Sequence, residues 1–334
     1  MKLYTYQVST RIGKFERIGA EFEGKIIDLN LACTAYFEQL NEPDPYDCAS
    51  FYIPLNMVRF FEYGERSKKA AVDSLGFVKD RLKRNGKIEG PNGEQIVYEL
   101  NEIKLMAPVP RPNIVRDCSV FLEHVRGMEK RRGRDVPNVF YKMPVYVTQS
   151  GAIVAGPRDP IFMPRYTKTL DFELELGLYI GKKGINIPEE DAEKYIAGFT
   201  VYNDVSARDM SSEENQMGFG PGKGKNFEHG SIMGPCLVTP DEIDYNNLKM
   251  IARVNGEVVA EDNSRDMYHK FPKIIAHISV EQYLYPGDFI ASGTSPHGTT
   301  QFSKLGRWLQ PGDIVEMEIE GIGLICNQVV KKGE

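Results

Sequence analysis

The chain reads Thr169-Leu170-Asp171-Phe172-Glu173-Leu174-Glu175-Leu176-Gly177-Leu178-Tyr179-Ile180-Gly181 where acidic and apolar side chains alternate most strictly. Side chains at positions i and i+2 of a β-strand share a face, so the pattern predicts a strand with Asp171, Glu173 and Glu175 on one side. Like charges on one strand face are destabilising unless water or a cation screens them. The apolar run 177–180 predicts that this strand continues into the interior.

Three carboxylates on one strand face have two explanations. One is the solvated face of an edge strand, which is common in antiparallel sheets. The other is a hard divalent cation, because Mg²⁺ and Ca²⁺ prefer carboxylate oxygens as ligands. The alternation alone does not decide between them, since residues 315–320 show the same pattern of glutamates and apolar side chains.

Two motifs downstream favour the cation. The first is Asn203-Asp204-Val205-Ser206-Ala207-Arg208-Asp209, and the second is the glycine-rich segment 218–227, which contains Gly224-Lys225-Asn226-Phe227. With the acidic run they form the series D-x-E-x-E-x(5)-G, N-D-x-S-x-R-D and G-K-x-F. In order and spacing this series resembles the signature of the fumarylacetoacetate hydrolase family. The resemblance extends from about residue 108 to the C-terminus and covers the first hundred residues only loosely.

The resemblance implies a set of functional residues. One Mg²⁺, with Mn²⁺ or Ca²⁺ as alternatives, is expected to bind Asp117, Glu173, Glu175 and Asp204, with Asp171 behind these ligands. These oxygen ligands suit hard ions and disfavour zinc. In the family's hydrolases a metal-binding aspartate precedes the water-activating histidine by seven positions, an interval that Asp117 and His124 reproduce. Arg208 and Lys225 are expected to bind the negative charge that develops during the reaction. The residues expected to contact the substrate are Tyr146, Gly293 and Thr294.

The activity implied by this site is cleavage of a carbon–carbon bond. A 1,3-diketo or 2-oxo acid would chelate the cation, which would stabilise the enolate left by bond cleavage, while His124 activates water. The sequence therefore predicts a hydrolase of acylpyruvates or related β-diketo acids, an activity of aromatic catabolism. Ser211 stands where the family's name-giving enzyme has glutamine, which leaves the substrate open.

Three alternatives stay open at this point. Decarboxylation of a 2-oxo acid, hydration of a 2-oxo-4-enoate and keto–enol isomerisation all pass through the same chelated enolate. A non-catalytic module, in which the carboxylates serve folding, is a further possibility. For His124 the alternative is an ordinary packed histidine on the apolar face of a helix.

Composition limits the partners and the compartment. The 334 residues carry a net charge of −6, and the short basic run 130–134 is expected to be a solvated loop near the site rather than a nucleic-acid surface. No run of about 18 apolar residues predicts a membrane span. The five dispersed cysteines fit a reducing compartment, so a cytoplasmic protein is expected. The family resemblance also implies a homodimer acting on a small 2-oxo or β-diketo acid.

The expected fold class is α+β, predominantly β. Three prolines within 108–112 predict a stiff connector between an N-terminal α+β domain, 1–107, and a larger domain, 108–334. Helices are expected at 31–40 and 63–84, and a further one from about Cys118 with Asp117 as its N-cap. Glycine-punctuated strands dominate the rest, for which the resemblance implies a mixed β-roll.

Overall fold

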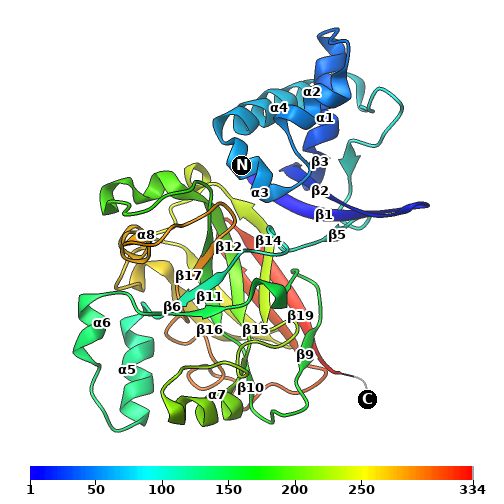
Figure 1. The fold of residues 1–334 in the computed structure, drawn as a ribbon. Helices are drawn as coiled ribbons and strands as arrows, with labels where there is room; N and C mark the ends of the chain where they lie inside the picture. The colour runs from blue at the N-terminus through cyan, green and yellow to red at the C-terminus, as the bar shows by residue number, and fades with distance from the viewer. Residues whose placement is uncertain (333–334) are drawn as a thin grey trace.

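The computed structural model describes residues 1–332, so the last two residues of the predicted domain 108–334 lie outside it. Figure 1 shows helices α1, α2 and α4 above strands β1 to β3 at one end of the molecule, with α3 beside these strands. Helices α5, α6 and α7 lie at the opposite end. The combination of several sheets with separate groups of helices confirms the predicted α+β class. Within residues 1–332 no helix is both long and apolar enough to cross a membrane.

The first part of the chain forms three strands, four helices and two short strands. Asp28 caps α1, since its side chain accepts a hydrogen bond from the amide of Leu31 at 2.8 Å, and α4 ends at Gly86 with φ 69°. The predicted helices at 31–40 and 63–84 are therefore confirmed with ends shifted by one or two residues. The elements are β1 (Lys2–Thr10), β2 (Gly13–Phe22), β3 (Lys25–Asp28), α1 (Leu29–Gln39), α2 (Pro45–Tyr52), α3 (Met57–Tyr63), α4 (Glu65–Asn85), β4 (Val97–Tyr98) and β5 (Lys104–Leu105).

Strands predominate in the rest of the chain. Asn255 and Gly256 form the turn of the hairpin between β15 and β16. The elements are β6 (Val115–Cys118), α5 (Leu122–Arg131), α6 (Asn138–Lys142), β7 (Tyr146–Gln149), η1 (Gly151–Ile153), β8 (Val154–Ala155), β9 (Ile161–Met163), β10 (Leu170–Asp171), β11 (Leu174–Ile180), η2 (Glu189–Tyr195), β12 (Ile196–Asp204), β13 (Ser206–Ala207), α7 (Arg208–Glu214), η3 (Asn215–Met217), β14 (Ser231–Val238), η4 (Pro240–Glu242), β15 (Lys249–Val254), β16 (Glu257–Asn263), η5 (Ser264–Asp266), α8 (Phe271–Ser279), β17 (Phe289–Ala291), β18 (Ile314–Ile319) and β19 (Gly323–Lys331).

The largest sheet joins early and late segments of the chain. Its strand order is β4-β3-β2-β1-β14-β12-β11-β17-β6-β7, with β5 added at β1 and β8 added at β14. Strand β1 pairs with β14 at Leu3 and Leu237, so the N-terminal strands extend the sheet built by residues beyond 113. A second sheet, β16-β15-β18-β19-β9, packs on it through contacts of β15, β18 and β19 with β11, β12 and β14. The domain division at residue 107 stays a prediction.

The acidic stretch lies in the centre of the large sheet. Strand β11 runs between β12 and β17, and every one of its residues is buried. Asp171, Glu173 and Glu175 are at most 5% exposed, which excludes the solvated edge-strand explanation. The predicted single strand is interrupted at Phe172 and Glu173, because Leu170 and Asp171 pair instead with β13.

One local expectation was wrong for an identifiable reason. Asp117 is not a helix N-cap: it lies in β6, paired in parallel with Ala291 of β17, and α5 begins only at Leu122. Hydrogen bonds from Val120 to Ser292 and from Tyr268 to Val120 hold the intervening backbone extended.

Candidate active site

Four carboxylates predicted as metal ligands meet in one cluster. Asp117 comes from β6, Glu173 directly precedes β11, Glu175 lies in β11, and Asp204 ends β12. One carboxylate oxygen from each residue lies within 4.8 Å of the others. The sheet order explains the convergence, because the strands that carry these residues are close neighbours in the order β12-β11-β17-β6. Only β17 lies between Glu175 and Asp117, and it ends in the small residue Ala291.

Gly293 and Thr294 follow β17 and hold Glu175. The Gly293 amide donates to Glu175 Oε2 at 3.1 Å, and the Thr294 hydroxyl donates to Oε1 at 3.3 Å. Gly293 has φ 78°, and a Cβ atom there would stand 2.0 Å from the Cys118 carbonyl oxygen, so only glycine fits. Two of the three residues predicted to bind substrate therefore lie beside the cluster and orient one of its carboxylates.

Two cationic side chains contact the cluster, Lys225 buried and Arg208 half-buried. Lys225 Nζ forms ion pairs with Glu173 Oε2 and Asp204 Oδ2. Arg208 donates to Asp171 Oδ2 at 2.7 Å and to Glu173 Oε1 at 2.5 Å. The residue before Lys225 must be glycine for the loop to pass this close to α7. A Cβ atom on Gly224 would stand 2.1 Å from the hydroxyl oxygen of Ser211 in α7. Lys225, expected from the family resemblance to contact developing negative charge, therefore lies against two of the four carboxylates.

The cluster holds more negative charge than these cations balance. Burial, reinforced by Asp204, raises the pKa of Asp117, and burial with Asp117 raises the pKa of Glu175. Burial also raises the pKa of Asp204 in spite of Lys225. Glu173 behaves differently: burial opposes ionisation, yet Arg208 and Lys225 hold its pKa below the usual range. The protein alone therefore stabilises the ionised form of only one of the four ligands.

The donor atoms fit a hard divalent cation. Asp117 Oδ1 and Asp204 Oδ1 are buried and have no hydrogen-bond partner among residues 1–332. Buried carboxylate oxygens are costly when nothing compensates them, and a cation would satisfy both atoms. Because all four candidate ligands are carboxylates, the cluster suits Mg²⁺, Mn²⁺ or Ca²⁺ better than zinc.

Cation binding is expected to stabilise the fold, and more so at high pH. Without a cation the raised pKa values of Asp117, Glu175 and Asp204 favour their protonated forms, so their contribution to stability falls as pH rises above about 4 through the folded-state values. At a hundredfold excess over its dissociation constant, Mg²⁺ should add about 2.7 kcal/mol. Calorimetry with Mg²⁺ and with EDTA should show a larger difference in melting temperature at pH 8 than at pH 5. An equal or smaller difference at pH 8 would contradict this account.

His124 lies in the wall of the site as a neutral imidazole. It is 5% exposed on α5, with its ring edge-on to Phe302 at 5.4 Å between centroids. Burial lowers its pKa to about 4, although the nearby Glu173 opposes this shift. Nδ1 has no hydrogen-bond partner within the described chain. The imidazole is therefore uncharged at neutral pH and able to accept a proton.

The neighbouring glutamates do not orient this histidine. Glu123 pairs with Arg126, and Glu129 binds Arg132 at 2.8 Å and Arg134 at 2.9 Å. The basic run 130–134 is exposed, as the sequence predicts for a solvated segment: its first two residues end α5, and Arg132 and Arg134 hold the rest against Glu129.

Tyr146 is the predicted site residue that the structure does not bring to the cluster. Side chains alternate along β7, so Tyr146 and Gln149 lie on opposite faces. Gln149 contacts Asp204, whereas the Tyr146 hydroxyl lies 3.4 Å from Gln282 Oε1. The other nine predicted residues lie in the cluster or within its immediate electrostatic environment.

Gln149 is a residue of the site that no sequence motif indicates. Its Nε2 donates to Asp204 Oδ2 at 2.9 Å, and its Oε1 lies 3.4 Å from the Tyr202 hydroxyl and 3.3 Å from the Ser231 hydroxyl. All four side chains are buried. Groups that hydrogen-bond a metal-binding carboxylate fix its orientation. The amide therefore positions Asp204.

Replacing Gln149 by leucine is expected to weaken Mg²⁺ binding about 10- to 100-fold, because Asp204 loses the donor that fixes its carboxylate. Titration calorimetry would give the dissociation constant, and saturating Mg²⁺ should restore most of the turnover. Gln282→Leu, which changes a glutamine outside the cluster, is the matched control. A Gln149→Leu protein with unchanged Mg²⁺ affinity would rule out the positioning role.

Comparisons with known proteins agree with this geometry. Residues 113–330 match the family model described as fumarylacetoacetate (FAA) hydrolase, C-terminal. A mitochondrial oxaloacetate tautomerase of Homo sapiens is 36% identical over 284 residues, covering 83% of this chain and 81% of that protein. The oxaloacetate tautomerase YisK of Bacillus subtilis is 35% identical over 247 residues, covering 72% and 78%. A maleylpyruvate hydrolase from Sphingobium, solved with manganese(II) and pyruvate, has the same fold with a TM-score of 0.69 at 22% identity, and the match covers all of both chains.

Proposed function

The chain belongs to the fumarylacetoacetate hydrolase family, and we propose that it is a divalent-cation-dependent enzyme that interconverts the keto and enol forms of a 2-oxo dicarboxylic acid such as oxaloacetate. The observation on which this proposal rests is the buried cluster of four carboxylates with a neutral imidazole and two cations beside it. Relatives from animals and from a bacterium that bear the name oxaloacetate tautomerase support the choice of reaction.

Asp117, Glu173, Glu175 and Asp204 would hold Mg²⁺ or Mn²⁺. When bound, such a cation supplies Lewis-acid polarisation of the ketone and carboxylate oxygens of a 2-oxo acid. The solved maleylpyruvate hydrolase with manganese(II) and pyruvate supports both the ion and the 2-oxo acid class. Gly293 and Thr294 on Glu175, and Gln149 on Asp204, keep these carboxylates in place before substrate arrives.

The protein's own groups move the proton and balance the charge. Tautomerisation takes a proton from C3 of the keto acid and delivers one to the oxygen at C2, with no net gain or loss of atoms. His124, uncharged above about pH 4, can accept the C3 proton and return it. Arg208, fixed by Asp171 and Glu173, and Lys225 supply positive charge to the oxygen at C2 and to the substrate carboxylates.

Hydrolysis of acylpyruvates is the second candidate, favoured by the same neutral imidazole. His124 can take a proton from water as readily as from carbon, which is the role that the sequence predicts for it. Within residues 1–332, however, no carboxylate forms a hydrogen bond to His124 that would orient it toward water. This arrangement favours a single proton shuttle over the two-stage acid–base chemistry of hydrolysis.

Product analysis separates the candidates. Enol-oxaloacetate should decay to the keto form faster with protein and Mg²⁺ than with Mg²⁺ alone, and EDTA should remove the difference. Acetopyruvate and further 2-oxo acids should be incubated in parallel, since hydrolysis of acetopyruvate yields acetate and pyruvate, whereas decarboxylation of 2-oxo acids yields carbon dioxide. If acetate forms and tautomerisation is not accelerated, hydrolysis of acylpyruvates would replace tautomerisation as the proposed reaction. The absence of any conversion would refute both.

The homodimer and the cytoplasmic location stay predictions. Sedimentation at micromolar concentration would measure the mass directly, and fractionation of the source cells would give the compartment.

A further inference from the structure

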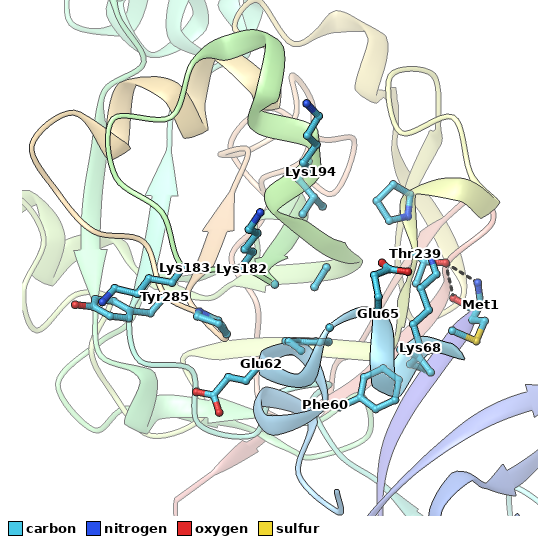
Figure 2. A pocket seen from close by; sticks show the side chains of 18 residues that line it. Met1, Phe60, Glu62, Glu65, Lys68, Lys182, Lys183, Lys194, Thr239 and Tyr285 are labelled. Atoms are coloured by element: carbon cyan, nitrogen blue, oxygen red, sulfur yellow. Dashed lines mark hydrogen bonds between the residues drawn. The ribbon is translucent and has the colours of Figure 1, made fainter. Parts of the chain in front are cut away.

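The large cavity in Figure 2 is not the entrance to the carboxylate cluster. It has a volume of about 810 Å³ and lies between α3, α4 and the segments at Gly181 and Ala197. Six residues separate Glu175 from Gly181, which corresponds to about 20 Å along a strand. A side chain that meets the substrate must therefore come from segments at the other end of these strands.

The loop that follows α7 lies at that end, beside the cluster. Gly220 packs against Val147 of β7, since a Cβ atom on this glycine would stand 3.9 Å from Cγ1 of the valine. Val147 is paired with Asp117 of β6, and directly opposed residues of an antiparallel pair share a face. It also lies two positions from Gln149, whose amide donates to the cluster. The loop 215–222 is therefore on the face of the sheet that carries the carboxylates.

The tip of this loop is apolar and uncovered. Phe219 is 88% exposed, more than any other large apolar side chain within residues 1–332, and Met217 is 74% exposed. Val147 is only half-buried, so part of an apolar side chain at the site also faces water. Burial of apolar surface is favourable, and both side chains would lose contact with water if the tip moved towards the cluster.

The base of the loop is anchored. Glu214 accepts hydrogen bonds from the amides of Lys223 at 2.5 Å and Gly224 at 3.0 Å. The Tyr166 hydroxyl donates to the Lys223 carbonyl at 2.8 Å. These bonds hold Lys225 in place separately from the tip.

Two glycines flank the exposed ring. Gly218 has φ 75° and Gly220 has φ 78°, and a Cβ atom on Gly218 would meet nothing within 4 Å. Glycine adopts positive and negative φ about equally well, so these positions can absorb the rotation that turns Phe219 towards Val147.

We propose that Phe219 closes over the 2-oxo acid bound at the carboxylate cluster and packs its ring against Val147 and carbon C3 of the substrate. This inference rests on the proposed function, because the occupant is the 2-oxo acid assigned there. Closure excludes water from C3, so that the proton exchanged at this carbon passes through His124.

A tryptophan reporter tests closure without turnover. The chain has one tryptophan, Trp308, so Trp308→Phe/Phe219→Trp carries a single reporter at the tip. Pyruvate, a 2-oxo acid with a methyl group at C3, should in the presence of Mg²⁺ move its emission to shorter wavelength and reduce quenching by acrylamide. Trp308→Phe/Ile12→Trp is the matched control, because Ile12 is 87% exposed in the turn after β1 and its reporter should not respond.

Phe219→Ala should raise the dissociation constant of pyruvate about tenfold in calorimetry at saturating Mg²⁺, because the buried ring is lost. Phe219→Leu should recover most of the affinity. Mg²⁺ affinity should be unchanged in both variants, which distinguishes loss of the cap from a collapse of the loop around Lys225. Unchanged pyruvate affinity in Phe219→Ala would overturn the proposal.

These readouts separate the cap from the proposed reaction. An emission shift without faster decay of enol-oxaloacetate would support the cap and refute tautomerisation. Pyruvate binding without an emission shift would refute the cap alone, and the absence of pyruvate binding would refute the cap together with the 2-oxo acid class. Emission that is already at short wavelength without pyruvate and depends on protein concentration would also overturn the cap, because a second copy of the chain would then cover the ring.

Discussion

Asp204→Asn is expected to abolish cation-dependent turnover. The substitution removes one of four converging charges, and Oδ1 of this residue is a buried oxygen with no other partner within residues 1–332. We expect the Mg²⁺ dissociation constant to rise at least about 100-fold, and kcat/KM to fall about 1000-fold, which is a loss of about 4.1 kcal/mol in transition-state stabilisation.

Titration calorimetry and steady-state kinetics at several Mg²⁺ concentrations would measure both effects. Glu316→Gln is the matched control, because it removes a glutamate from the other alternating run, in β18. An Asp204→Asn protein that binds Mg²⁺ as tightly as the native chain would exclude this cluster as the cation site. Its thermal stability in EDTA should change little, because burial raises the pKa of Asp204 toward the protonated form, of which asparagine is an uncharged isostere, and Lys225 keeps Glu173 as a partner.

These two glutamate-rich runs show what a sequence pattern can and cannot establish. Residues 171–175 and 316–320 alternate in the same way. The first lies at the centre of a sheet with both faces buried, and the second has half-buried glutamates in a strand of the smaller sheet. Alternation predicts which side chains share a face, but burial depends on neighbouring strands that are remote in sequence. The N-D-x-S-x-R-D motif distinguished the two runs, because it predicted a further carboxylate, Asp204, from a second segment of the chain.

Asp117 illustrates a local signal that tertiary structure overrides. An aspartate before an apolar stretch resembles a helix N-cap, and the sequence therefore predicts a helix from Cys118. Parallel pairing with Ala291, more than 170 residues away, places it in a strand instead. Its membership of the cluster was still predicted, because the interval to His124 indicated it independently of secondary structure.

Gln149 and Tyr146 show why supporting residues are harder to predict than ligands. They lie three positions apart in the same short strand, and on opposite faces of the sheet. The register of β7 against β6 decides which of them faces Asp204, and no motif encodes that register. The sequence accordingly named Tyr146, whereas Gln149 makes the contact.

His124→Asn is expected to lower kcat about 10²- to 10⁴-fold while leaving Mg²⁺ affinity within twofold of the native value. The imidazole is the proposed proton acceptor in both candidate reactions and is not among the four clustered carboxylates. His277→Asn makes the same chemical change on α8 and should leave turnover unchanged. Undiminished turnover in His124→Asn would refute the assignment of this residue as the base.

The pH profile of the native enzyme tests the same residue without a substitution. Burial lowers the pKa of His124 to about 4, so the imidazole stays unprotonated as pH falls from 8 to 5 and loses its function only near pH 4. At saturating Mg²⁺, kcat should therefore fall near pH 4, because protonation removes the base. A decline centred near pH 6.5 would indicate a solvated histidine, in conflict with its position against Phe302.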